Sequence, residues 1–187
     1  MIERIRLQID EFGRRNPGLN PLFFLEAART ALAHHHPSSP AVFRVKTWRA
    51  EQLELEVHFA SPDPRSAQSM EREHFIEVGA IALAGLLLPH LEGKQITRVT
   101  RRRDRVDYFL GVEPGDFRWI LEVGGMSRGT PLGLLRRKRG QLLQSPLRLG
   151  PAFLDGYVSV TKFSYPGVTM LDFVPGARED DRRGSPR

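Results

Sequence analysis

Apolar and polar residues follow two different spacings in the first part of the chain. Residues 2–13 and 21–34 place apolar side chains at helical spacing, which predicts two helices. Residues 41–48 and 53–59 alternate apolar with polar side chains, which predicts two strands with one face toward solvent. The segment 60–69 contains three serines, two prolines and one aspartate, and it is predicted to form a loop.

The pattern changes after this loop. We expect residues 1–62 to form an N-terminal extension of two helices and two strands that packs on the rest of the chain. From residue 70 the predicted order is helix, three strands, helix, strand, and the second helix is a crossover that predicts parallel pairing of the strands it joins. Residues 175–187 are highly charged and are predicted to be disordered. The predicted elements from residue 70 are a helix at 70–88, strands at 95–100, 106–111 and 117–123, a helix at 131–144, and strands at 157–163 and 168–174.

The composition favours a soluble, cytoplasmic protein. There is no cysteine, which excludes disulfides and thiolate metal sites. The longest apolar run, 80–91, is shorter than the roughly 18 residues that cross a bilayer, and Pro89 and His90 interrupt it. The N-terminal residues alternate charged with apolar side chains, unlike a signal peptide.

The charge balance is basic, with 28 Lys and Arg against 22 Asp and Glu and a net charge of +6. Arginine predominates, and its planar guanidinium suits phosphate groups and base edges. A GC-rich genome also raises the arginine content, so the distribution matters more than the sum. The segments 94–105 and 136–139 are densely basic, which makes nucleic acid the expected partner.

Two acidic residues stand out between these basic segments. Asp107 opens one predicted strand, and Glu122 lies fifteen positions later near the end of the next. A hairpin of this length can lay both carboxylates side by side, and carboxylates are ligands that Mg²⁺ prefers. A carboxylate inside the apolar strand "WILEV" is costly unless it is paired or bound to a metal ion. Glu122 is therefore the strongest single candidate for a functional residue.

The strand order and the two acids resemble the PD-(D/E)XK nuclease superfamily. The resemblance covers about residues 70–174 and implies a restriction-endonuclease-like αβββαβ core with a mixed sheet. It implies a Mg²⁺ or Mn²⁺ site formed by Asp107, Glu122 and the carbonyl of Val123, with Glu77 on the preceding helix as a further acid. The superfamily motif has a lysine two residues after the second acid, and Gly124 stands there in this chain.

Basic residues from other elements are the candidates for the missing lysine and for contacts to nucleic acid. Lys138 lies on the helix after the Glu122 strand, and such helices pack back over the sheet, which makes it the preferred replacement. Arg128 is the alternative, although a permanently charged guanidinium is a poor base. The residues expected to contact nucleic acid are Arg101, Arg102, Arg103, Arg128, Arg136, Arg137 and Gln141.

Each candidate also has a purely structural interpretation. Asp107 follows "RRRDR" and can pair with an arginine. Glu122 can face solvent, because strand alternation does not decide which face is buried. Glu77 is of a type that lies most often on a helix surface.

Two hypotheses of different classes follow. The first is a metal-dependent nuclease, which the retained acids favour. The second is a degenerate, non-catalytic relative that binds proteins or serves as a scaffold subunit of a larger bacterial complex for defence, mobile elements or repair. The glycine at position 124 favours this second hypothesis.

Overall fold

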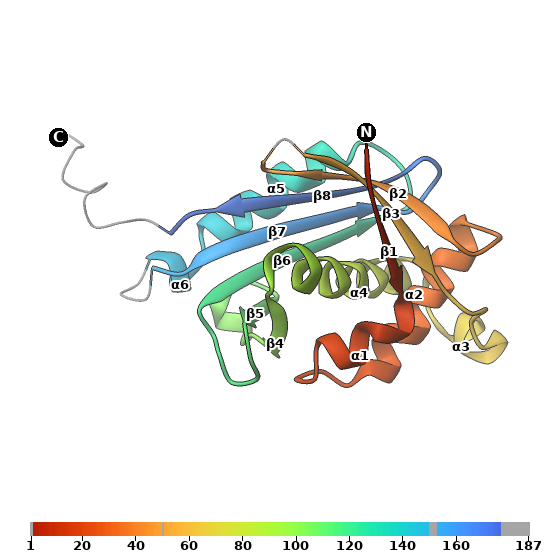
Figure 1. The fold of residues 1–187 in the computed structure, drawn as a ribbon. Helices are drawn as coiled ribbons and strands as arrows, with labels where there is room; N and C mark the ends of the chain where they lie inside the picture. Colours follow the sequence, from red (N-terminus) through yellow and green to blue (C-terminus); the bar gives the residue numbers. More distant parts are fainter. Residues whose placement is uncertain (1, 50, 150–152, 177–187) are drawn as a thin grey trace.

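The computed structural model describes residues 2–49, 51–149 and 153–176, so most of the predicted disordered tail lies outside the described residues. Within this part of the chain, eight strands form one mixed sheet with α-helices on both of its faces (Figure 1). The strands are β1 (Glu3–Gln8), β2 (Ala41–Thr47), β3 (Gln52–His58), β4 (Gln95–Val99), β5 (Tyr108–Gly111), β6 (Trp119–Met126), β7 (Asp155–Lys162) and β8 (Gly167–Val174). The six α-helices are α1 (Phe12–Arg15), α2 (Pro21–His35), α3 (Pro64–Ser69), α4 (Arg72–Glu92), α5 (Pro131–Leu143) and α6 (Pro146–Leu149), and two single 3-10 turns are η1 (Ile9–Glu11) and η2 (Arg102–Asp104).

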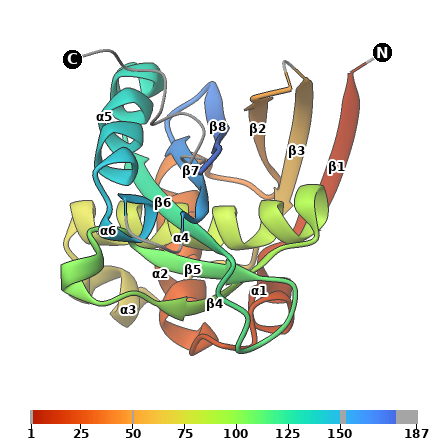
Figure 2. The ribbon, with the colours of Figure 1, turned by 90° about the vertical axis from the view of Figure 1, so that its left-hand side faces the viewer.

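The sheet order is β1-β3-β2-β8-β7-β6-β5-β4. From α4 onward the chain follows the predicted order of helix, three strands, helix, strand. The three strands β4, β5 and β6 form an antiparallel meander, and β7 pairs with β6 in parallel after the crossover through α5, as predicted. The sheet is strongly twisted, so that β1 and the β4–β5 pair point in different directions (Figure 2).

The predicted helix at 2–13 is wrong. Its first part is the strand β1, which pairs with β3 in parallel, and only from Ile9 does the chain turn into η1 and α1. Ile5 and Leu7 are buried while Arg4, Arg6 and Gln8 are exposed, which is the alternation of a strand with one buried face. On the outer face, Arg4 and Arg6 form ion pairs with glutamates of β3.

The N-terminal segment is a part of the same sheet as the later strands. It supplies three strands rather than the two predicted, and β2 pairs with β8 in parallel. The predicted loop at 60–69 contains the short helix α3, which begins at Pro64 after Asp63, whose side chain accepts a hydrogen bond from the Arg65 amide. Aspartate followed by proline is a helix start signal that the composition of the loop obscured.

The helix α4 is the central helix of the fold. It packs against α1, α2 and η1 and lies on β4, β6 and β7, while α5 covers the opposite face of β6, β7 and β8 (Figures 1 and 2). By length and composition α4 is apolar enough to cross a membrane, but 67% of its apolar window is buried within the fold, which a core helix explains.

Pro89 does not end α4, although the predicted helix stops before it. A proline has no N–H, so the carbonyl of Gly85, one turn earlier, lacks its helical donor. The buried side chain of Asn16 supplies the missing hydrogen bond, with Nδ2 at 2.8 Å from that carbonyl oxygen. The same side chain accepts a hydrogen bond from the amide of Ile96 at 2.8 Å, and it thereby ties the N-terminal segment to both α4 and β4.

We expect Asn16→Ala to lower the free energy of unfolding by about 2–4 kcal/mol, because two buried backbone groups lose their partner. Asn20→Ala is the matched control, because Asn20 only caps the start of α2 at an exposed position, and it should cost about 1 kcal/mol. Urea unfolding followed by circular dichroism measures both. Equal costs for the two variants would contradict the role assigned to Asn16.

Candidate functional site

The site is built where β6 extends beyond its neighbour β5. The ladder between the two strands joins Tyr108–Leu110 with Trp119–Leu121, whereas β6 continues to Met126. Asp107 lies immediately before β5 and extends its pairing with β6 by one residue. The amide of Asp107 donates to the Leu121 carbonyl at 3.2 Å, and its carboxylate oxygen Oδ2 accepts from the Val123 amide at 2.8 Å. The Asp107 side chain therefore takes the place of a neighbouring strand and holds the backbone of β6 at Val123.

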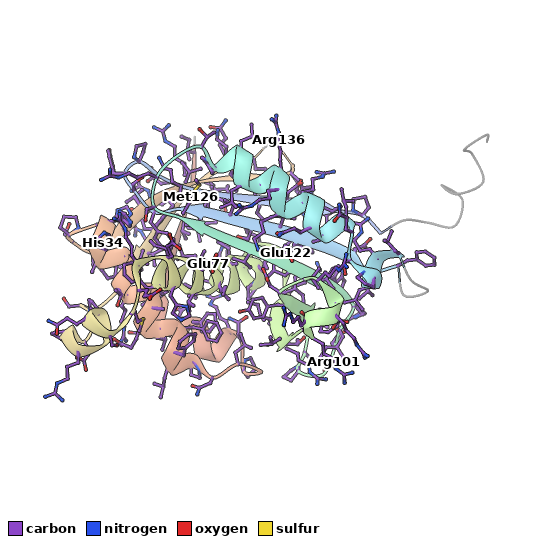
Figure 3. All side chains as sticks on the ribbon, turned by 180° about the vertical axis from the view of Figure 1, so that it is seen from behind. His34, Glu77, Arg101, Glu122, Met126 and Arg136 are labelled. Atoms are coloured by element: carbon purple, nitrogen blue, oxygen red, sulfur yellow. The ribbon has the colours of Figure 1, made fainter. Side chains whose placement is uncertain are left out.

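Glu122 points from β6 toward α5. Ile120, two positions earlier on the same face, belongs to the small apolar cluster under α5, while Leu121 belongs to the main core on the opposite face. Only 4% of the Glu122 side chain is exposed. Figure 3 shows Glu122 on β6 between α5 and the β4–β5 pair. The interpretation in which Glu122 faces solvent is thus wrong.

Lys138 of α5 joins the two carboxylates. Its Nζ lies 2.9 Å from Glu122 Oε2 and 3.4 Å from Asp107 Oδ2, so both acids converge on one ammonium group, on the side of the sheet that α5 covers. Leu135 and Leu142 are buried at helical spacing before and after Lys138, and this apolar stripe turns Lys138 toward the sheet.

Gly124 also faces α5. A Cβ atom at Gly124 would lie 3.1 Å from Leu134 Cδ2, and Leu134 precedes Lys138 by one turn of α5. The place where the superfamily motif has its lysine is therefore filled by an apolar side chain of the facing helix. The same helix supplies, one turn later, the lysine that contacts both acids.

Burial dominates the electrostatics of Glu122. Removal from water raises the pKa of its carboxyl group to about 7, and the neighbouring charge of Asp107 adds to the increase, whereas Lys138 opposes it. Burial alone would lower the pKa of Lys138, but Asp107 and Glu122 together outweigh it and raise that pKa. Lys138 consequently keeps its proton at neutral pH, while Glu122 lies close to its titration midpoint.

The donor set fits a divalent cation of the Mg²⁺ type. Asp107 and Glu122 offer carboxylate oxygens, and strand alternation directs the Val123 carbonyl to the free edge where the Leu121 carbonyl and the Val123 amide make their hydrogen bonds. Mg²⁺ usually keeps several waters and needs only one or two carboxylates from the protein. A metal ion held by Asp107, Glu122 and Val123 stays a prediction made from the sequence.

Glu77 does not join this group. It is an exposed residue of α4, which lies on the opposite face of β6, and a Cβ atom on Gly125 would lie 3.1 Å from the Glu77 Cα. Figure 3 shows Glu77 on α4, away from Glu122. Within the described ranges, no three acidic or histidine side chains are placed to hold one metal ion. The prediction that Glu77 joins Asp107 and Glu122 as a third acid is therefore wrong for this structure.

Arg128 is also separate from the two acids. It is exposed and lines a pocket of about 530 Å³ together with Arg72, Glu77 and the end of β6. It is therefore Lys138, rather than Arg128, that the fold brings to Asp107 and Glu122.

The remaining basic candidates are exposed but spread over the surface. Arg136 lies on the outer side of α5, far from Arg101 near the other end of the sheet (Figure 3). Arg137 lines a shallow pocket with Gly125 and Met126. Gln141 is exposed one turn after Lys138. Arg101, Arg102 and Arg103 are exposed on or beside η2, only a few residues before Asp107.

A hollow over β4 and β5, which Phe109 lines two positions after Asp107, was not anticipated from the sequence. It has a volume of about 260 Å³ and combines arginines of the segment 98–103 with Phe109 and Phe117. The sequence alone could not have located it, because alternation puts Arg98 on the face of the buried Ile96, and only a register shift between these two residues turns Arg98 outward.

Comparison of the chain with protein-family models, with curated proteins and with solved structures gives no match. A function can therefore be inferred only from the geometry of the site.

The raised pKa of Glu122 predicts a pH dependence of stability. Between about pH 4.5 and pH 7 the folded protein keeps a proton on Glu122 that the unfolded chain releases, so the free energy of unfolding falls as the pH rises through this window and levels off above it. The glutamine of Glu122→Gln cannot titrate, so this variant should lack that decrease in the free energy of unfolding. The decrease amounts to about 1–3 kcal/mol over the whole window.

Denaturant unfolding of both proteins at a series of pH values, in the presence of a chelator, measures the difference. Glu77→Gln controls for the loss of one carboxylate on the opposite face. A stability difference between wild type and Glu122→Gln that stays constant from pH 4.5 to 8 would contradict the assignment.

Proposed function

We propose that this chain is a PD-(D/E)XK-like domain that associates with nucleic acid and cleaves it with Mg²⁺ or Mn²⁺, and in which α5 supplies the motif lysine. The observation that carries the proposal is the position of the Lys138 ammonium, 2.9 Å from Glu122 and 3.4 Å from Asp107. A lysine beside two acids is what the motif requires, and Gly124 explains why it comes from another element.

The order of elements supports the same proposal. The helix α4, the meander β4–β6, the crossover helix α5 and the strand β7 follow one another as in the αβββαβ core that the resemblance implies. The positions of the two acids agree with what the resemblance implies: Asp107 lies immediately before the second of these strands, and Glu122 lies within the third.

The roles of the residues follow from their protonation. A divalent ion held by Asp107, Glu122 and the Val123 carbonyl would polarise the phosphodiester and make a bound water more acidic. Lys138 keeps its proton, so it serves as a cation and hydrogen-bond donor toward the phosphate or the attacking water. Asp107 is the most accessible of the three side chains, with 36% of its surface exposed, so the site opens to substrate on that side.

The distribution of charge favours nucleic acid as the substrate. The exposed arginines at 101–103 lead directly into Asp107, and Arg137 and Gln141 lie on the helix that carries Lys138. Such residues contact phosphates without reading sequence, and their contribution falls with rising salt. A cytoplasmic location, as expected from the sequence, gives access to these substrates.

A specific observation also favours the second hypothesis. Lys138 already contacts both acids, so its ammonium group can balance their charge without a metal ion. Among the described residues Glu77 adds no third acid. In that case the chain is a non-catalytic member that binds a protein partner or nucleic acid as a scaffold subunit.

Cleavage assays distinguish the two. Purified protein with Mn²⁺ or Mg²⁺ should cleave duplex DNA, single-stranded DNA or RNA, and EDTA should stop the reaction. We expect Asp107→Asn, Glu122→Gln and Lys138→Met each to reduce the rate by about 10²-fold or more, because each removes a group in contact with the reacting centre. Lys46→Met, at an exposed position of β2, is the control and should leave the rate unchanged.

Binding of Mn²⁺ decides the case if no cleavage is found. Mn²⁺ that binds at pH 8 to wild type but not to Glu122→Gln supports the metal site even without a known substrate. No bound Mn²⁺, no cleavage of any of the three nucleic acids and an unchanged biological activity of Asp107→Ala would together establish the scaffold alternative.

A further inference from the structure

The hollow over β4 and β5 has the composition of a nucleotide subsite, and we call it the arginine–phenylalanine pocket. It lies between η2 and the connection from β5 to β6. Its principal lining residues are Arg98, Arg101, Arg103, Phe109, Phe117 and Leu147.

The pocket lies on the same face of the sheet as the acidic site. Phe109 packs against the apolar cluster under α5, and Asp107, two positions earlier along the same edge, directs its carboxylate to Lys138 of α5. Arg98 pairs in register with Phe109, so their side chains share that face. The helix α5 covers β6, β7 and β8, which leaves this part of β4 and β5 open.

The arginines of the pocket differ from those that acidic side chains hold elsewhere in the described residues. Among the residues that the structure describes, none of the three is in an ion pair, whereas Arg4, Arg29 and Arg139 are each held by a carboxylate. The acid within the pocket, Asp104, accepts a hydrogen bond from the backbone amide of Arg101. Three guanidinium groups thus surround the pocket with one carboxylate, which leaves a surplus of positive charge facing it.

The aromatic side chains supply a surface for stacking. Phe117 has 39% of its surface exposed, and its ring centroid lies 5.3 Å from that of Phe109 at a tilt of 56°. The Arg98 guanidinium stands 5.9 Å from the centre of the Phe117 ring, which is at the outer limit of a cation–π contact and leaves the guanidinium free to move to a phosphate.

We propose that the arginine–phenylalanine pocket binds one nucleotide of a single-stranded nucleic acid, with the base against Phe117 and the flanking phosphates at Arg98, Arg101 and Arg103. Aromatic rings and arginines in one groove are the features by which proteins bind single strands without sequence preference. A volume of about 260 Å³ is below the 300–1,000 Å³ of sites for whole drug-sized ligands, so it suits a single unit of a longer chain.

A single strand fits the pocket better than a duplex does. The bases of a duplex are stacked and paired, so the ring of Phe117 could not reach one without the cost of unstacking. Binding in the pocket requires neither a metal ion nor cleavage. The inference rests on the proposed function only where it takes the bound strand to be the substrate of the acidic site at Asp107. We therefore expect the substrate class of the acidic site to be single-stranded DNA or RNA.

Binding measured in EDTA tests the pocket separately from the chemistry. Fluorescence anisotropy with labelled dT12, U12 and a 12-base-pair duplex gives three affinities for each protein. We expect the single strands to bind more tightly than the duplex, and Phe117→Leu to weaken their binding about 10-fold, which is within the measured range for loss of one base stack. Phe117→Tyr should restore the affinity. The relative affinities of dT12 and U12 distinguish DNA from RNA.

Two control variants separate the pocket from general charge and exposed aromatic surface. Phe23→Leu changes another exposed phenylalanine, on α2, and should have no effect. Arg103→Gln should lower the slope of log affinity against log salt by about 0.7, the value for one phosphate contact on a single strand. Arg44→Gln, on the exposed face of β2 away from the pocket, should leave the slope unchanged.

Equal affinities of wild type and Phe117→Leu, or an equal loss in Phe23→Leu, would overturn the assignment of the pocket, and so would preferred binding of the duplex. Each of these results leaves Mn²⁺-dependent cleavage intact if that activity exists. Conversely, binding of single strands that depends on Phe117, without any cleavage, supports the pocket and removes only the catalytic part of the proposed function.

Discussion

A carboxylate with 4% of its side chain exposed cannot remain charged without a partner, and this requirement organises the centre of the molecule. Glu122 is on the face of β6 that α5 covers, so its partner has to come from α5. Lys138 fulfils this role and reaches Asp107 as well, which fixes the rotation of α5 on the sheet and joins the start of β5 to β6. Removing one member of such a buried ion pair typically costs about 3–5 kcal/mol, because it leaves the remaining charge buried without a partner.

The two glycines that follow in β6 adapt this strand to helices on both of its faces. Gly124 meets Leu134 of α5, while Gly125 lies so close to α4 that a Cβ atom there would overlap the backbone carbonyl of Ile76. A long side chain at either position would push a helix away from the sheet. The strand can therefore carry Glu122, but a lysine that reaches both acids has space only on the facing helix. A glycine at position 124 is thus compatible with a lysine that contacts both acids.

The sequence allowed the main elements to be predicted because most of them have one clear period and a clear end. The helices α2 and α5 begin at prolines preceded by polar residues, and β2 and β3 alternate without interruption. β1 was missed because Ile2, Ile5, Ile9 and Phe12 match helical spacing while Ile5, Leu7 and Ile9 match strand spacing. Only pairing with β3, a contact between distant residues, decides between the two.

The site was predicted in part for the same reason. Asp107, Glu122 and Lys138 lie on elements whose order was correct, so their convergence followed from the hairpin and the crossover. The face of the sheet on which Glu122 points depends on which helix covers which side, and this cannot be obtained from alternation alone. Glu77 was expected in the same cluster because α4 precedes the strands, whereas in the structure α4 and α5 lie on opposite faces of β6.

The hydrogen bonds of Asn16 show that the segment before residue 62 cannot be treated as an appendage. A fragment that begins at residue 70 would retain both acids and Lys138, but it would lose the donor to the Gly85 carbonyl and the acceptor for the Ile96 amide. It would also expose the edge of β8 that β2 now covers, and an open edge of this kind invites pairing with other chains. The part of the chain that carries both acids is therefore expected to fold only together with its first sixty residues, as one unit.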